Sequence, residues 1–506
     1  MQEAKINRSR IFPAFPDGQE ILDAVESKDC SSEELSALAS IQGAVNKNGV
    51  RIAIFDSHTD EGAFTWADTL GLRYTLTDKY DIFRKYLPLS GGVVLYDTEK
   101  SRHYLNLAFC AGATYGCAVM SRRLFERLGE MGISAEINED LSTLPFVTPE
   151  EIYGYAYEKY WPRCNHRLLI SQNPNEAFHI RDMAIAGGCA VIFTENRDEN
   201  QRRIYEKFLD DMEPGASVVT GWYTEERSGI TTATSRGLST VPSDLFSNMT
   251  VFSREKEILK RKPAPSREPE NKVYAALFIS DGDNIQYCQR YLRKLWDASA
   301  ADRGSVALNW TISPALTEAA PDIMNYYYST ATQKDCFVSG PSGFGYAMPV
   351  NTLAEEIPAG NYVKDDSAFA EYAAMSGYYC GLAGLPAVTV WDNMTAEQRH
   401  LYAVNAPELL GITVQLFTDN EEKISSTETG GMPVKQLTPC YCTEISHLER
   451  VLERKIEAEK KDAPLFIACQ ISVWGKITIS QIAGLEKRLC ENTVPLSLSG
   501  QTSFSR

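Results

Sequence analysis

Histidine and positive charge are both scarce in this sequence of 506 residues. The six histidines form no HxxxH pair, which argues against a metal centre built from paired histidines, such as that of a polysaccharide deacetylase. The 50 lysines and arginines stand against 67 aspartates and glutamates, for a formal net charge of -17. Binding to nucleic acid or to a membrane is therefore not expected, and a neutral ligand such as a sugar fits this balance better.

Long apolar runs and paired cysteines are missing as well. No segment offers the roughly eighteen consecutive apolar residues of a membrane span, and residues 1–8 lack the apolar core of a signal peptide. The chain as written is thus expected to be cytoplasmic, or secreted if a leader was removed. The twelve cysteines contain no CxxC pair, so we interpret them mostly as buried free thiols and expect neither a zinc site nor a cofactor.

What is present is the composition of an ordinary globular protein, with 43% hydrophobic and 23% charged residues. Short apolar segments alternate with amphipathic ones along the whole chain, which predicts an α/β protein of several domains. The expected division is an α/β domain over residues 1–98, a second small one over 99–165, a third over 166–257, a linker over 258–271 and a C-terminal domain over 272–506.

The C-terminal domain is expected to be a (β/α) barrel-like, TIM-like domain, complete or distorted, because seven or eight strand–helix units follow the linker. The expected strands cover residues 273–280, 306–312, 336–340, 387–391, 413–417, 433–437, 465–470 and 494–498. In such a barrel the functional residues lie at the carboxyl ends of the strands.

Carboxylates and indole rings recur at those strand ends. Hydrolysis of a glycosidic bond needs one carboxyl group to protonate the leaving oxygen and another to activate water or attack the sugar, and aromatic faces bind the apolar face of a sugar ring. The pattern therefore predicts a glycosidase acting on an oligo- or polysaccharide. The candidate catalytic residues are Asp281, Asp283 and Asp392, and the candidate substrate-binding residues are Asn284, Trp310, Tyr346, Trp391 and Trp474.

Plainer interpretations of the first strand end stay open. Residues 281–284 read Asp-Gly-Asp-Asn, which is also a common turn and can cap the helix that follows. A divalent cation near Asp281 and Asp283 is conceivable, although the other ligand positions of an EF-hand are missing and no metal is expected. Glu225 and Glu226 follow an earlier expected strand and could reach the barrel mouth, but a solvated pair is the simpler account.

A second distinctive segment is Gly343-Phe344-Gly345-Tyr346-Ala347-Met348-Pro349, in which glycines flank aromatic rings. It lacks the spacing of a nucleotide-binding loop. It resembles the signature of the GxGYxYP family of bacterial glycoside hydrolases, except that Met348 stands at the penultimate Tyr position. The resemblance covers nearly the whole chain and implies small α/β domains in front of a catalytic domain that acts on carbohydrate.

Two further hypotheses remain beside the glycosidase. A glycan-binding protein without catalysis would use the same strand ends, but no carboxyl group in it would have a raised pKa. An interaction protein would neither bind nor cleave sugar. The sequence leaves the sugar, the stereochemistry and the oligomeric state open.

Overall fold

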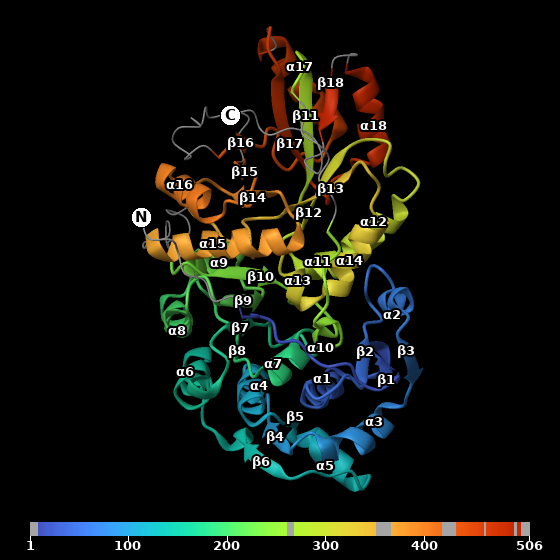
Figure 1. Ribbon diagram of the computed structural model, residues 1–506. Coiled ribbons are helices and arrows are strands. Elements are labelled where there is room, and N and C mark those ends of the chain that lie inside the picture. The colour runs from blue at the N-terminus through green and yellow to red at the C-terminus, as the bar shows by residue number, and fades with distance from the viewer. Residues whose placement is uncertain are drawn as a thin grey trace.

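The computed structural model describes residues 9–260, 268–350, 366–416, 432–459, 462–489 and 493–496. The ribbon shows the C-terminal half of the chain stacked on the N-terminal half, with the helices of each half packed around its strands (Figure 1). Every named strand pairs with its neighbours in parallel. The α/β class predicted from the alternation is confirmed.

Three small sheets make up the N-terminal half. The first is ordered β2-β1-β3, the second β5-β4-β6 and the third β10-β9-β7-β8. The strands are β1 (Ile21–Glu26), β2 (Ile52–Phe55), β3 (Arg73–Leu76), β4 (Val93–Tyr96), β5 (Ala118–Ser121), β6 (Ile137–Asp140), β7 (Leu168–Ser171), β8 (Val191–Ile192), β9 (Val218–Gly221) and β10 (Ser239–Pro242). The expected boundary at residue 98 falls after β4, so it places β4 in the first domain, whereas β4 belongs to the second sheet. The alternation of strands and helices along the chain does not tell which sheet a strand joins.

Helices join and cover these strands. Several begin where the sequence offers a capping residue: Ser31 and Glu34 form a capping box at α1, and Thr148 and Glu151 form one at α6. The helices of this half are α1 (Ser32–Asn46), α2 (Thr65–Leu70), α3 (Lys79–Tyr86), α4 (Tyr104–Tyr115), α5 (Arg122–Glu130), α6 (Pro149–Lys159), α7 (Arg181–Gly187), α8 (Glu199–Asp210), α9 (Glu226–Thr234) and α10 (Met249–Phe252).

The C-terminal half contains a nearly closed parallel barrel, ordered β16-β15-β14-β13-β12-β11-β17. Its strands are β11 (Val273–Ile279), β12 (Leu308–Ile312), β13 (Asp335–Ser339), β14 (Ala387–Trp391), β15 (Gly411–Gln415), β16 (Val434–Gln436) and β17 (Leu465–Ile471), with β18 (Thr493–Leu496) beside β11. Its helices are α11 (Ile285–Gln289), α12 (Tyr291–Ala298), α13 (Leu316–Ala319), α14 (Pro321–Thr330), α15 (Asp366–Ala383), α16 (Ala396–Asn405), α17 (Ile445–Glu459) and α18 (Ile479–Arg488).

The barrel is distorted at two places. One edge of β11 is shared, because β18 pairs with residues 273–276 and β12 pairs with Phe278 and Ile279. Beyond β16, the backbone N–H of Thr438 donates to the carbonyl of Ala468 at 2.8 Å, so the chain after β16 continues the closure against β17. The predicted barrel-like fold is confirmed in its distorted form, and the eighth expected strand lies outside the ring of strands.

A shared apolar core holds the third sheet and the barrel together. One continuous cluster of buried side chains includes Leu168 and Val218 from the third sheet and Val273 and Trp296 from the barrel region. All seven residues of β11 are buried, as expected of a central parallel strand. Apolar contact on this scale fixes the two parts against each other, so a site can be built from both.

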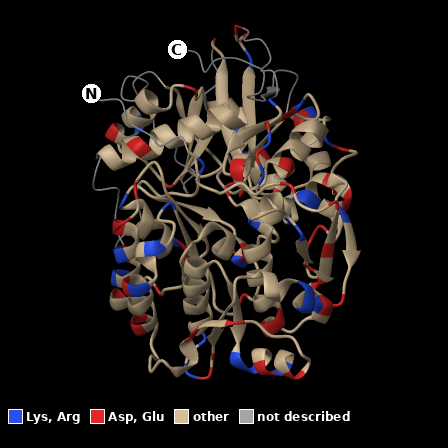
Figure 2. Cartoon of the chain, turned by 60° about the horizontal axis from the view of Figure 1, so that its bottom comes forward, with Lys and Arg blue, Asp and Glu red and all other residues tan. Residues whose placement is uncertain are grey.

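Within the described ranges, eleven cysteines carry free thiols, and no helix there is both long and apolar enough to cross a bilayer. Acidic and basic side chains are interspersed over the small domains in the view of Figure 2.

Candidate functional site

The Asp281 carboxylate lies directly beyond the end of β11. Its residue has a positive φ of 69°, and the following Gly282 packs so tightly that a Cβ there would lie 1.8 Å from the carbonyl oxygen of Thr311. The Tyr441 hydroxyl donates to Asp281 Oδ1 at 2.9 Å, and the Ser280 hydroxyl donates to Oδ2. The turn therefore aims Asp281 at two hydroxyl donors.

Asp283 and Asn284 have different environments. Asp283 is 7% exposed, and a Cβ on Gly340 would lie 2.4 Å from its backbone nitrogen. Asn284 Oδ1 accepts the backbone N–H of Tyr287 at 2.9 Å and caps α11. The helix-cap interpretation thus holds for Asn284, which has its amide nitrogen left to offer a substrate.

Burial raises the pKa of both aspartates in this region. Burial raises the pKa of Asp281, while the hydrogen bonds from Ser280 and Tyr441 oppose that rise. Burial, and then the charge of Asp281, raise the pKa of Asp283 well above its usual range. Such shifts are typical of functional sites but also occur in structural networks.

A third carboxyl group comes from the third domain. Glu226 begins α9, and its Oε1 accepts the Tyr346 hydroxyl at 2.8 Å. Glu226 as a whole residue is exposed, although this hydrogen bond is partly buried. Burial of the carboxyl raises the pKa of Glu226, as does the charge of Asp281, and the Tyr346 hydrogen bond opposes the rise. Glu226 therefore belongs to the same electrostatic group as the two aspartates.

The glycine-rich segment holds the two domains together at this point. Tyr346 exchanges backbone hydrogen bonds with Thr240 of β10, at 2.6 and 2.9 Å. Gly345 has a φ of +87°, and a Cβ there would lie 2.9 Å from the Thr240 carbonyl oxygen. Glycine is needed here because the two backbones approach closely and because φ is positive.

Aromatic rings connect the carboxyl groups. The Trp391 ring contacts Tyr346, with centroids 5.5 Å apart, and Tyr441, at 5.9 Å. Trp222 of the third domain also stacks on Tyr346, with ring centroids 6.4 Å apart. The rings thus form a continuous row from Tyr346, which donates to Glu226, to Tyr441, which donates to Asp281.

Two other candidate tryptophans lie apart from this row. Trp474 is 59% exposed and packs on Tyr291 at 4.9 Å, and its side chain lowers the pKa of Asp281 through a hydrogen bond. Trp310 is not brought to the site. It is 1% exposed, and its indole N–H donates to Asp335 at 2.9 Å, because alternation along β12 turns it toward Trp296 of α12.

Asp392 lies in an ion pair with Arg227 of α9, at 2.8 Å. Its residue has a φ of 62° and is 3% exposed. Arg227 directly follows Glu226, so this ion pair ties the end of β14 to the third domain at the site. The sequence indicates that Glu226 could reach the barrel mouth but favours a solvated pair, and it assigns no role to Arg227.

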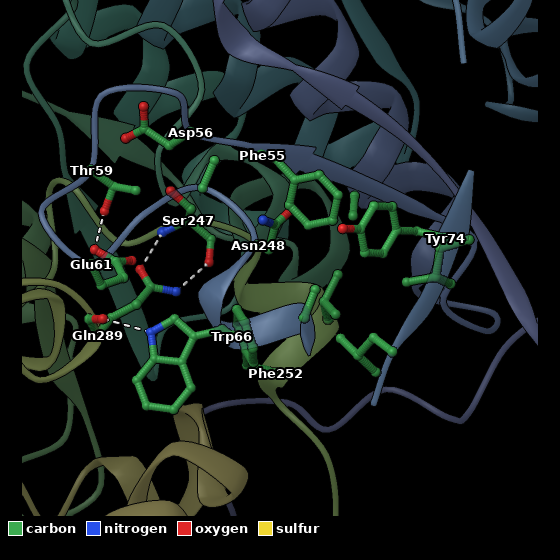
Figure 3. Close-up of a pocket in the computed structure, with 16 residues that line it drawn as sticks. Phe55, Asp56, Thr59, Glu61, Trp66, Tyr74, Ser247, Asn248, Phe252 and Gln289 are labelled. Carbon is green, nitrogen blue, oxygen red and sulfur yellow. Dashed lines mark hydrogen bonds between the residues drawn. The ribbon is translucent and has the colours of Figure 1, made fainter. Parts of the chain in front are cut away.

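The described residues contain no group of three or more His, Cys, Asp or Glu side chains placed to hold a metal ion. A separate cavity lies where the first domain meets the third domain and the barrel domain, lined by Phe55, Trp66, Phe252 and Gln289 among others (Figure 3). Its volume of about 30 Å³ suits one or two waters and no sugar ring.

Comparisons with known proteins agree with this architecture. Residues 271–494 match the family model described as "GxGYxYP putative glycoside hydrolase C-terminal domain", and residues 166–254 match "GxGYxYP third domain". A crystal structure of "a putative hydrolase" from Bacteroides thetaiotaomicron VPI-5482 superposes with a TM-score of 0.79 over 99% of this chain and 97% of that chain, at 19% identity. At that identity the likeness shows the fold.

Other comparisons add nothing to the argument. A UDP-GlcNAc 2-epimerase from Methanocaldococcus jannaschii aligns over 88% of this chain and 94% of that chain at 10% identity, with a TM-score of 0.14, a level from which no common fold follows. The search of curated proteins found no match.

Proposed function

Because the chain belongs to the GxGYxYP family, we propose that it hydrolyses glycosidic bonds of an oligo- or polysaccharide at the carboxyl end of its barrel. The observation that carries the proposal is the pair Asp281 and Asp283 beyond β11, where two carboxyl groups interact and burial raises the pKa of both. Glycosidases need one ionised and one neutral carboxyl group at the scissile bond.

The hydrogen bonds suggest which group is ionised. Asp281 accepts from the Tyr441 and Ser280 hydroxyls, and donors to a carboxylate favour its charged form. Asp281 is therefore the proposed nucleophile or base, which either attacks the anomeric carbon or takes a proton from the attacking water. Asp283 lies beside it, and burial and the charge of Asp281 favour the neutral form of Asp283.

The remaining candidates receive supporting roles. Trp391 and Trp474 offer ring surface for a sugar, and Asn284 offers its amide N–H groups. Tyr346, which is 3% exposed, has no free ring surface and instead supports the Trp391 ring. Asp392 is proposed to position Arg227 and α9, because its carboxylate is already held in a buried ion pair. Trp310 is left out of the proposed site because it packs behind the barrel.

The test is a panel of aryl glycosides and oligosaccharides incubated with the wild type, Asp281→Asn, Asp283→Asn and Asp392→Asn. Asp302→Asn, an exposed carboxylate elsewhere in the barrel domain, is the matched control. We expect turnover by the wild type and the control, and a loss of about 10²-fold or more in kcat for Asp281→Asn. Turnover that is unchanged in Asp281→Asn would refute the assignment.

A glycan-binding protein without catalysis is the second candidate, favoured by the row of rings at the site. It predicts sugar binding by calorimetry with no turnover by the wild type across the whole panel. The same set of proteins therefore decides between the two functions.

A further inference from the structure

We infer that Glu226, supplied by the third domain, is the carboxylic acid that protonates the leaving oxygen, so that the catalytic centre is divided between two domains. This inference rests on the proposed function and goes beyond the aspartate pair of the barrel. Its basis is the position of Glu226, the way it is held and its access to solvent.

Glu225 and Glu226 are adjacent but have separate tasks. The Glu225 carboxylate accepts the backbone N–H groups of Arg227, at 3.2 Å, and Ser228, at 2.8 Å, and so caps α9. Glu226 contributes nothing to this cap. Its carboxyl instead crosses to the barrel domain and meets the Tyr346 hydroxyl at 2.8 Å.

The position of Glu226 is fixed from both sides. Arg227 binds Asp392 at 2.8 Å, and the backbone of Tyr346 pairs with Thr240 of β10. These contacts join α9 and β10 of the third domain to the end of β14 and the glycine-rich segment of the barrel domain, around the Glu226 carboxyl group. The family signature therefore places Tyr346 so that it orients Glu226, a role that glycine-flanked aromatic residues alone do not reveal.

Glu226 is better placed than Asp283 to reach a glycosidic oxygen. Asp283 is 7% exposed and packs against the backbone of Gly340, whereas Glu226 is an exposed residue with a partly buried carboxyl group. Burial of the carboxyl, and to a lesser extent the charge of Asp281, raise the pKa of Glu226, which favours the neutral form that an acid catalyst needs. Since Tyr346 donates to Oε1, the proton of the neutral acid sits on Oε2.

The step balances with water as the only co-reactant. The Oε2 proton passes to the glycosidic oxygen as the bond between that oxygen and the anomeric carbon breaks, and the alcohol leaves neutral. The anomeric carbon gains an oxygen from water, directly or after a covalent intermediate on Asp281. The proton released by that water returns Glu226 to its neutral form and leaves Asp281 ionised, as both were at the start.

The test compares phenyl glycosides with 2,4-dinitrophenyl glycosides, whose leaving group needs no proton. For Glu226→Gln we expect kcat/KM on the phenyl substrate to fall by about 10² to 10⁴-fold, with a much smaller fall on the dinitrophenyl substrate and loss of the alkaline limb of the pH profile. Glu226→Asp should recover part of the phenyl activity. Glu225→Gln, the matched control, should show no dependence on the leaving group.

Three results would overturn the inference. Equal losses on both substrates in Glu226→Gln would mean a structural role, and the same leaving-group dependence in Asp283→Asn instead would assign the acid to the barrel. Either result leaves glycoside hydrolysis standing. No turnover by the wild type on either substrate class would instead refute hydrolysis itself, and Glu226 as its acid with it.

Discussion

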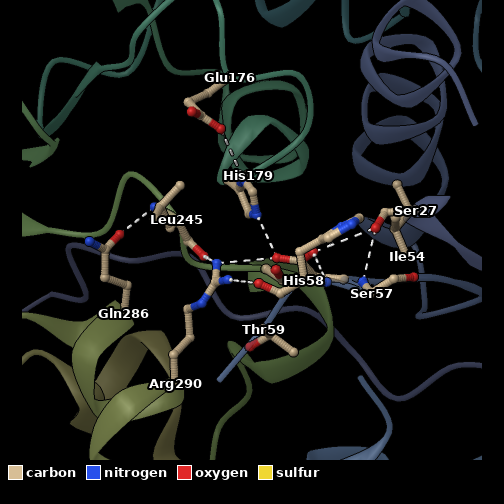
Figure 4. Close-up of polar contacts among 12 residues, drawn as sticks. Ser27, Ile54, Ser57, His58, Thr59, Glu176, His179, Leu245, Gln286 and Arg290 are labelled. Carbon is tan, nitrogen blue, oxygen red and sulfur yellow. Dashed lines mark hydrogen bonds and ion pairs between the residues drawn. The ribbon is translucent and has the colours of Figure 1, made fainter. Parts of the chain in front are cut away.

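His179 should make the stability of this protein depend on pH in a specific way. It lies buried between Asp56, at 3.1 Å, and Glu176, at 3.3 Å, and Arg290 of the barrel domain reaches Asp56 at 3.2 Å (Figure 4). The network therefore joins the first domain, the third domain and the barrel. Replacing His179 by Gln removes the titrating group at its centre.

The signs and one magnitude follow from the contacts. Burial alone would raise the pKa of Asp56, but hydrogen bonds from His179 and from the His58 backbone lower it from 3.8 to about 2. At about 1.36 kcal/mol per pKa unit, that shift corresponds to about 2 kcal/mol. This stability is present above pH 3.8 and is lost as the pH falls toward 2.

His179 has the opposite sign. Burial alone would lower its pKa, but the hydrogen bonds to Asp56 and Glu176 raise it above 6.5. Its contribution is complete below pH 6.5 and is lost as the pH rises through the raised value. The network should thus stabilise the fold most between about pH 4 and 6.5.

The assay is thermal unfolding from pH 4 to pH 9 of the wild type, His179→Gln and His58→Gln. His58 is an exposed histidine in the same polar cluster, so His58→Gln is the matched control. Burial raises the pKa of Glu61 to about 7, which also affects the pH dependence, so the difference between wild type and His179→Gln isolates His179. That difference should be largest below pH 6.5 and shrink above it. A difference that is constant with pH would refute the reasoning.

Three further substitutions test the site. Tyr346→Phe removes a hydrogen bond that lowers the pKa of Glu226, so the alkaline limb of the pH profile should move to higher pH; a limb that moves the other way would contradict this. Arg227→Met breaks the buried ion pair with Asp392 and should lower the free energy of unfolding by about 3 to 5 kcal/mol in denaturant titration, whereas an unchanged midpoint would show that the pair is not needed. Trp474→Ala, at a ring 59% exposed, should raise KM for an oligosaccharide while the melting temperature stays within a few degrees; an unchanged KM would exclude the ring from binding.

The barrel could be predicted because its signals are local. A fully apolar segment such as β11, followed at once by Asp281 and Asp283, is visible in the sequence, and parallel strands bring such ends to one rim. The GxGYxYP signature likewise lies in one continuous segment. The assignment to this family is confirmed by the matches to two of its domain models.

The other features depend on contacts between residues far apart in the sequence. Trp310 follows the same strand-end pattern as Trp391, but the alternation of β12 turns its ring to the helices, and one residue of register decides this. Glu226 lies 120 residues before Tyr346, and nothing in its own segment says that Glu225 takes the cap and leaves Glu226 for the barrel. The Asp392 ion pair spans 165 residues and is equally invisible to local patterns.

The most direct test of the central claim is cleavage of an oligosaccharide in water enriched in ¹⁸O, followed by mass spectrometry of the products. Hydrolysis by the wild type should place one ¹⁸O atom on the anomeric carbon of the product that gains the new reducing end, while the other product keeps the glycosidic oxygen, and Asp281→Asn should release little or no labelled product over the same time. Sugar that binds but stays intact with the wild type, or equal labelling with Asp281→Asn, would contradict hydrolysis at this site.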